Sequence, residues 1–135
     1  MNGPLLDTHA WIWWIHGDAR LGRATLAALD QLDAAHRPSI SAISLWEVAM
    51  LVSRGRVAFD CTLEAWLEKA AHPLTVRTLP ITPQIAADVA HLPEALTRDP
   101  ADRLIVSTGR VHGLRIVTKD AVIADSGLLR RWSAR

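Results

Sequence analysis

Short apolar runs alternate along the chain with longer amphipathic stretches, and two of these runs end on a carboxylate. Residues 5–6 are followed at once by Asp7, and residues 114–118 lead to Asp120. Runs of this length bounded by polar residues are typical of short buried strands. We expect further strands at residues 39–41 and 76–81.

Between these runs, apolar side chains recur at helical spacing. Asp99-Pro100 is a strong helix opening, because Asp suits the N-cap and Pro the first helical position. Gly55 suits the left-handed conformation that often ends a helix. After Asp120 we expect a loop and then a last apolar stretch at residues 128–132. The predicted helices run from Thr8 through Trp14, over 22–36, from Ser41 or Ser44 to Gly55, over 62–71, from Thr82, and over 99–113.

Strands that alternate with helices indicate an α/β fold with a mostly parallel sheet and helices on each side. In such sheets ligands bind at the carboxyl ends of the strands. Two carboxylates follow strands directly, and three lie at the starts of helices that open toward the same edge. We therefore expect one crevice to contain Asp7, Glu47, Asp99, Asp102 and Asp120.

The composition is that of one globular domain over residues 1–135, with 50% hydrophobic and 21% charged residues. No apolar run approaches the roughly 20 residues that cross a bilayer, so we expect a cytoplasmic protein without a membrane partner. The single cysteine, Cys61, offers no internal disulfide. A net charge of +1 excludes a global basic field, and the arginines near acidic positions favour an acidic pocket with a basic rim.

A cluster of ionised carboxylates is unfavourable unless their pKa values rise or a cation lies among them. Hard divalent cations such as Mg²⁺ and Mn²⁺ prefer oxygen ligands and commonly bind carboxylates together with substrate phosphate oxygens. Such an ion activates water and stabilises the oxygens of a phosphodiester during hydrolysis. The cluster therefore favours cleavage of a nucleic-acid backbone.

Each carboxylate also has a purely structural interpretation. Ser44 and Glu47 match the spacing of a capping box, in which Glu47 would bond the start of its helix. Asp99 serves equally well as an N-cap alone, and Asp102 as a first-turn carboxylate favoured by the helix dipole. Asp125 is a weaker candidate for the site.

Four segments together resemble the PIN-domain family over almost the whole chain, and most closely its VapC-like ribonuclease toxins. They are LLDTHAWIWW, ISAISLWEVA, DPADRLIVSTGRVHG and LRIVTKD. The positions that form the acidic pocket in that family are held here by Asp7, Glu47, Asp102 and Asp120.

The resemblance implies a three-layer α/β/α sandwich and metal-dependent endoribonuclease activity with Mg²⁺ or Mn²⁺. It also implies the toxin role in a type II toxin-antitoxin system. The expected partners are an RNA substrate, a small VapB-like antitoxin that blocks the pocket, and a second copy of the chain in a homodimer.

The resemblance also assigns roles to individual residues. Asp7 and Asp102 would be the principal metal ligands, and Glu47 and Asp120 would hold metal-bound water or a second ion. Asp99 lies one helical turn before Asp102, so it is either a further ligand or only the helix cap.

Substrate contacts are expected from residues beside these acids. Thr8 would orient an acidic neighbour or a water, and Arg103 is the expected phosphate contact. Arg98 and Lys119 are further basic residues near the acids, whereas His9 is expected to be oriented by local packing.

Two other functions fit parts of this pattern. A haloacid-dehalogenase-like phosphatase would use Asp7 as its nucleophile, but that chemistry wants a second Asp where His9 stands. A non-catalytic PIN-like module would keep the acids only for metal-stabilised folding or partner recognition.

Overall fold

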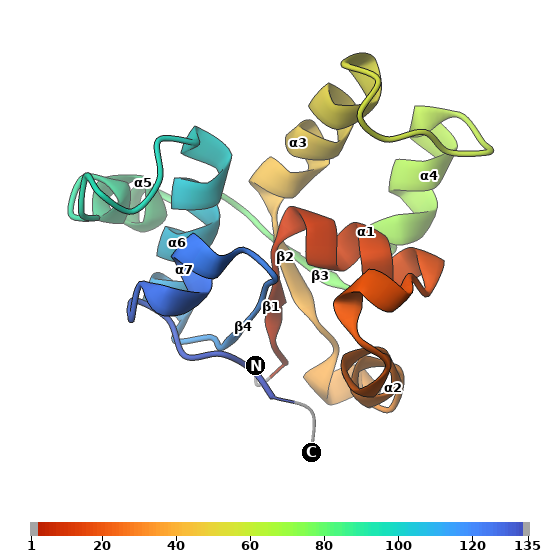
Figure 1. Ribbon diagram of the computed structural model, residues 1–135, viewed down its shortest axis with the longest axis horizontal. Coiled ribbons are helices and arrows are strands. Elements are labelled where there is room, and N and C mark those ends of the chain that lie inside the picture. The colour runs from red at the N-terminus through yellow and green to blue at the C-terminus, as the bar shows by residue number, and fades with distance from the viewer. Residues whose placement is uncertain (1–2, 134–135) are drawn as a thin grey trace.

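The computed structural model describes residues 3–133 and contains a four-stranded sheet in the order β3-β2-β1-β4 (Figure 1). Every pairing between neighbouring strands is parallel, and Leu5 at the centre pairs with both Ser39 and Ile116. The predicted parallel sheet is thus confirmed. Its strands are β1 (Leu5–Leu6), β2 (Ser39–Ser41), β3 (Arg77–Leu79) and β4 (Ile116–Val117).

Helices cover both faces of this sheet, as Figure 1 shows with α1, α2 and α4 on one side and α5, α6 and α7 on the other. The three-layer α/β/α arrangement is therefore as predicted. The helices are α1 (Thr8–His16), α2 (Arg23–Asp30), α3 (Ala42–Ser53), α4 (Leu63–Ala70), α5 (Pro83–Val89), α6 (Pro100–His112) and α7 (Ala121–Asp125), with short 3-10 turns η1 (Ala19–Leu21) and η2 (Ala34–His36).

Each face of the sheet has its own apolar core. Adjacent side chains of a strand point to opposite faces, so Leu6 packs into one core with Trp11, and Leu5 into the other with Ile105. All four side chains are fully buried. The two-residue strand β1 therefore connects both cores and fixes where Asp7 leaves the sheet.

Two predicted elements differ from the structure. The helix expected over residues 22–36 ends at Asp30, because Asp33 accepts a hydrogen bond from the His36 backbone N–H and opens the separate turn η2. The loop expected after Asp120 begins instead with α7. The last apolar stretch contributes a bridge between Ile116 and Arg131, parallel to β4.

The connections after β1 and β2 are as short as the chain allows. Helix α1 begins one residue after Asp7, and α3 begins directly after Ser41. The N-termini of both helices consequently open at the carboxyl edge of the sheet, where the partial positive charge of helix ends favours anions. No helix within residues 3–133 has the length and apolar character needed to cross a membrane.

Candidate metal centre

A pocket of about 340 Å³ opens at the carboxyl edge of the sheet. All five carboxylates expected to share a crevice contribute to its wall, although they come from four separate segments of the chain. Its lining residues are Asp7, Thr8, His9, Trp13, Glu47, Asp99, Asp102, Lys119 and Asp120. The pocket is therefore predominantly acidic, with Lys119 as its one lysine.

Asp7 is the most buried of these acids, with 7% of the residue exposed. It caps α1, because its Oδ1 accepts a hydrogen bond of 2.9 Å from the backbone N–H of Ala10. Its Oδ2 accepts a hydrogen bond from the Thr118 hydroxyl. Burial raises the pKa of the Asp7 carboxyl, and the hydrogen bonds from Thr118 and Ala10 oppose that rise.

Glu47 does not take part in a capping box, so that interpretation is wrong. Helix α3 is capped by Ser41, whose hydroxyl accepts a hydrogen bond of 3.2 Å from the Ile43 N–H. Ser44 lies inside the helix, and its Oγ is 2.9 Å from the Thr8 Oγ1. The Thr8 hydroxyl donates in turn to the Glu47 carboxylate and so holds it toward the pocket.

Asp99 and Asp102 enter the pocket from the first turn of α6. Asp99 caps that helix, as its Oδ1 accepts a hydrogen bond of 2.9 Å from the Ala101 N–H. The cap does not remove Asp99 from the site. Glu47, Asp99 and Asp102 each offer one carboxylate oxygen, and these three oxygens all lie within 4.8 Å of one another.

The electrostatics of these three acids are unfavourable without a cation. Burial, followed by the nearby charges of Asp99 and Glu47, raises the pKa of Asp102 to about 7. Burial also raises the pKa of Glu47, and the negative charge of Asp99 adds to that effect. In the metal-free state, protons therefore compete for the positions that a cation would stabilise.

The donor set fits a hard divalent cation. All three side chains in the cluster offer carboxylate oxygens, which Mg²⁺ and Mn²⁺ prefer, and neither His nor Cys belongs to it. Within residues 3–133 no second group of His, Cys, Asp or Glu side chains is gathered as closely. Glu47, Asp99 and Asp102 are therefore the residues best placed to hold a metal ion.

Asp120 also lines the pocket and is linked to Asp7 through Thr118. Its Oδ1 accepts hydrogen bonds from the Val122 and Ile123 N–H groups and so caps α7. Its own N–H donates to the Thr118 Oγ1 over 3.0 Å. The Thr118 hydroxyl thus links the Asp7 carboxylate after β1 to the backbone N–H of Asp120 after β4.

Thr118 and Ser44 are residues of the site that were not predicted from the sequence. Each is a buried hydroxyl that touches an acid or its hydrogen-bonding partner. Thr118 has a local signal, since a hydroxyl two residues before Asp120 is well placed to accept its N–H. Ser44 has none, because its contact with Thr8 joins residues 36 positions apart.

The rim of the pocket contains an aromatic residue that was not predicted. Trp13 lines the wall beside the exposed His9, with 5.7 Å between their ring centroids. The Arg20 guanidinium lies 5.1 Å from the Trp13 ring centroid in a cation–π contact. Arg20, on η1, is paired with Asp18 and lines a neighbouring pocket that shares His9 and Trp13 with this one.

Three of the predicted residues lie outside the pocket wall, the exposed Arg98 among them. Arg103 follows Asp102 on α6, but its guanidinium donates to four backbone carbonyls of the segment before α6. The position of Arg103 in the structure therefore does not favour the phosphate contact that was expected of it. Asp125, the weaker candidate, lies at the end of α7 and lines a different hollow.

Comparisons with known proteins agree with this geometry. The family model described as PIN domain matches residues 5–127. Ribonuclease VapC22 of Mycobacterium tuberculosis is 39% identical over 120 residues, covering 89% of this chain and 88% of the relative.

Solved structures show the same fold at lower sequence identity. A toxin-antitoxin complex from Klebsiella pneumoniae aligns with a TM-score of 0.66 and 20% identity, over 94% of this chain and 95% of that chain. The structure of FitAB bound to an IR36 DNA fragment aligns with a TM-score of 0.65 and 22% identity, over 95% and 92% of the respective chains.

Proposed function

The chain belongs to the PIN-domain family, and on that premise we propose that it is a metal-dependent endoribonuclease and the toxin of a toxin-antitoxin pair. The ribonuclease named among its relatives supports the reaction class. The observation that carries the proposal is the cluster of Glu47, Asp99 and Asp102, whose oxygens lie within 4.8 Å of one another. Such a cluster serves phosphodiester hydrolysis once a cation is present.

The proposed cofactor is Mg²⁺ or Mn²⁺, held by Glu47, Asp99 and Asp102. When bound, the ion supplies positive charge to phosphate oxygens and activates a water for in-line attack. Asp7 and Asp120 remain proposed ligands of the ion, of its waters or of a second ion. The Asp7 carboxylate is already held by the Thr118 hydroxyl, and the Asp120 carboxylate by the backbone N–H groups that follow it, so little reorganisation is needed when the cation enters.

The protein's own residues prepare the site before RNA arrives. Thr8 holds the Glu47 carboxylate in place, and the N-termini of α1 and α6 stabilise the negative charges of Asp7 and Asp99. Lys119 is the proposed contact with the RNA backbone at the wall of the pocket. Trp13 at the rim offers a ring on which an unpaired base can stack.

Two protein partners belong to this proposal. A small antitoxin is expected to cover the acidic pocket, since a toxin with nuclease activity must be held inactive in the cell that makes it. One of the structural neighbours is a toxin-antitoxin complex, which supports a partner of this kind. The homodimer and the cytoplasmic location implied by the resemblance remain predictions.

Cleavage of total RNA by purified, antitoxin-free protein tests the nuclease directly. We expect cutting with Mg²⁺ or Mn²⁺, none with EDTA, and loss of cutting in Asp102→Asn. The exposed Asp60 lies outside the pocket, so Asp60→Asn is the matched control and should cut as the native protein does. Equal cutting in EDTA, or full activity of Asp102→Asn, would overturn the proposal.

A non-catalytic binding module is the second candidate, because the same cluster can hold a metal without chemistry. Failure to cut any RNA, combined with a metal-dependent rise in melting temperature, would favour that function. The phosphatase alternative has lost its support. The family model that matches residues 5–127 is that of the PIN domain, and His9 stands where this chemistry wants a second Asp.

A further inference from the structure

The segment that brings Asp99 to the pocket is an irregular connection between α5 and α6, over residues 90–99. We propose that Arg103 is a positioning residue for the metal site, because its guanidinium holds this connection in the shape that places Asp99 beside Glu47 and Asp102. The inference rests on the proposed function of that site as a metal centre.

The guanidinium of Arg103 is surrounded by carbonyl oxygens of that connection and of the end of α5. Its Nη1 donates to the carbonyls of Pro93 and Thr97 over 3.1 and 3.0 Å. Its Nη2 donates to those of Leu92 and Val89 over 3.2 and 3.4 Å. One planar side chain thereby joins four points spread over nine residues, a task that suits the fixed fork of arginine.

The path from Arg103 to the Asp99 carboxylate is short. The Thr97 carbonyl accepts from Arg103, and the Thr97 Oγ1 accepts a hydrogen bond of 3.2 Å from the Asp99 N–H. The Arg103 backbone N–H also donates to the Asp99 carbonyl over 3.1 Å. Asp99 is thus held from both sides, through Thr97 before it and through the first turn of α6 after it.

Arg103 acts through this geometry and not by neutralising the acids. It makes no ion pair with any carboxylate in the part of the chain that the structure describes. It is also absent from the pocket wall, although it follows Asp102 directly. Its positive charge lies against carbonyls at the C-terminal end of α5, and the partial negative charge of a helix C-terminus favours a cation. The acidic pocket therefore keeps its negative charge for a metal ion.

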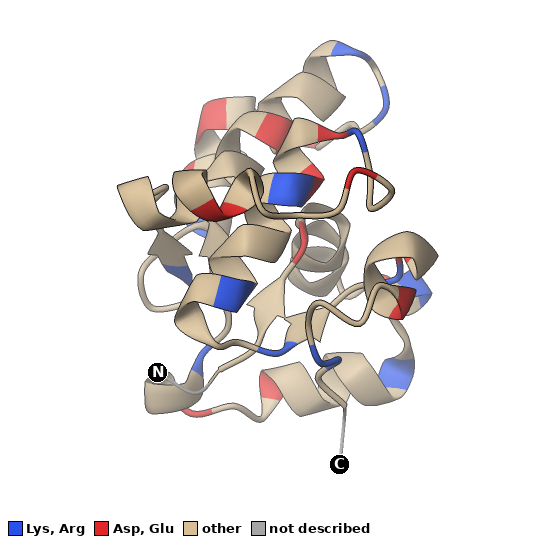
Figure 2. Ribbon diagram, turned by 90° about the vertical axis from the view of Figure 1, so that its left-hand side faces the viewer, with Lys and Arg blue, Asp and Glu red and all other residues tan. Residues whose placement is uncertain are grey.

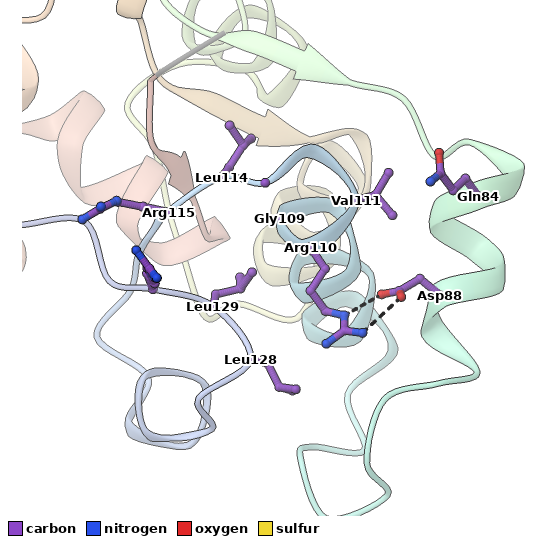
Figure 3. A pocket seen from close by; sticks show the side chains of 11 residues that line it. Gln84, Asp88, Gly109, Arg110, Val111, Leu114, Arg115, Leu128 and Leu129 are labelled. Carbon is purple, nitrogen blue, oxygen red and sulfur yellow. Dashed lines mark hydrogen bonds and ion pairs between the residues drawn. The ribbon is translucent and has the colours of Figure 1, made fainter.

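Helix α6 contains a second arginine that provides a matched control. Arg110 also ties α6 to α5, through an ion pair in which its Nε lies 2.9 Å from the Asp88 Oδ2 (Figure 3). That pair lies near the opposite end of α6, and the Arg110 guanidinium donates to the Asp88 carboxylate rather than to a carbonyl of the 90–99 connection. Removing Arg110 weakens the packing of the same two helices without releasing Asp99.

The test compares Mn²⁺ binding by calorimetry to the purified full chain and to Arg103→Ala, Arg103→Lys and Arg110→Ala. Loss of an outer-shell partner typically weakens metal binding on the order of 10- to 100-fold. We expect at least a tenfold higher Kd for Arg103→Ala, faster hydrogen exchange in residues 90–99, and an unchanged Kd for Arg110→Ala. Arg103→Lys should lie between, since one ammonium reaches fewer carbonyls.

The outcomes separate this inference from the proposed function. If the native chain binds no Mn²⁺, the metal site itself is wrong. If the native chain binds and Arg103→Ala binds within twofold of it, or if Arg110→Ala is equally impaired, the positioning role is wrong. Should Arg103→Ala fail to fold, the same Kd comparison between Arg103→Lys and Arg110→Ala decides the question.

Discussion

Asp99 shows how one carboxylate serves the fold and the site together. Its Oδ1 accepts the Ala101 N–H at the start of α6, and one of its oxygens belongs to the cluster with Glu47 and Asp102. The sequence offered the cap or the ligand as alternatives, but a carboxylate has enough lone pairs for both. Local chemistry predicted the cap, whereas the proximity of Glu47 depends on how α3 and α6 pack.

Asp102→Asn should stabilise the metal-free protein above neutral pH. The carboxylate in the folded state has a pKa of about 7, raised by burial and by neighbouring acids, so its ionised form opposes folding. Because the side chain is only partly buried, solvent screens this effect, and we expect a gain of about 1 kcal/mol in the free energy of unfolding. Thermal unfolding in EDTA measures it.

The pH dependence of this gain follows from the raised pKa. Between the pKa of the unfolded carboxyl and about 7, the folded state holds the proton and the unfolded state does not, so stability falls as pH rises through this range. The advantage of Asp102→Asn should thus be full at about pH 8.5 and nearly absent at about pH 4. A variant less stable than the native chain at both pH values would contradict the prediction.

At the scale of elements, strand ends and helix starts were predictable because their signals are local. Asp7 and Asp120 close apolar runs, and Asp99 precedes a proline. The start of α3 was ambiguous because Ser41 and Ser44 are equally good caps. The distant contact with Thr8 turns Ser44 inward, and that contact is invisible to local patterns.

Helix α7 was missed for a different reason. It spans five residues, Ala121–Asp125, which is too few to show helical periodicity. Its signal was the cap, since Asp120 accepts from the two N–H groups that follow. The contacts of Arg103 were equally hard to predict. Successive residues of a helix point in different directions, so the neighbour of Asp102 in sequence need not face the pocket.

Gly3 fixes the approach of β1 to the segment before β2, and Gly3→Ala should be strongly destabilising. A Cβ at this position would lie 2.1 Å from the Arg37 carbonyl oxygen and 2.3 Å from that of His36. These are backbone atoms, so relief requires the chains to move apart, and we expect a loss of about 3 kcal/mol. Chemical denaturation measures the change.

Gly55→Ala is the control for this substitution. Gly55 has a φ of +70° and nothing within 4 Å of an added Cβ, so only backbone strain of about 1–2 kcal/mol is expected. Equal losses of unfolding free energy in Gly3→Ala and Gly55→Ala would show that the close approach of β1 to the segment before β2 does not cause the destabilisation.

Across the whole molecule, charge is distributed unevenly despite the net charge of +1. Figure 2 shows most acidic positions in the upper part of the view and several basic ones around the lower end. The positions of the acids after strands and at helix starts predicted that they gather at the carboxyl edge of the sheet. The order of the strands was needed to place Asp7 between Glu47 on one side and Asp120 on the other. Overall charge alone therefore says little about this protein's partners.

Metal binding should stabilise the entire fold in a pH-dependent manner. A ligand present at about 100 times its Kd adds roughly 2.7 kcal/mol, provided that it binds only the folded state. Protons compete for Asp102, whose pKa is about 7, so the rise in melting temperature with Mg²⁺ should be larger above pH 7 than at about pH 6. The rise should vanish in Asp102→Asn and persist in Asp60→Asn. A pH-independent rise, or one retained in Asp102→Asn, would place the ion elsewhere.

The most direct test of the metal centre is a crystal structure of the chain grown with Mn²⁺, with anomalous difference density used to locate the ion. The cluster predicts a peak bounded by carboxylate oxygens of Glu47, Asp99 and Asp102, with any second peak on the side of Asp7 and Asp120. The proposed metal centre would be contradicted by a peak that touches none of Glu47, Asp99 and Asp102. It would also be contradicted by well-ordered density for these side chains with no peak at saturating Mn²⁺.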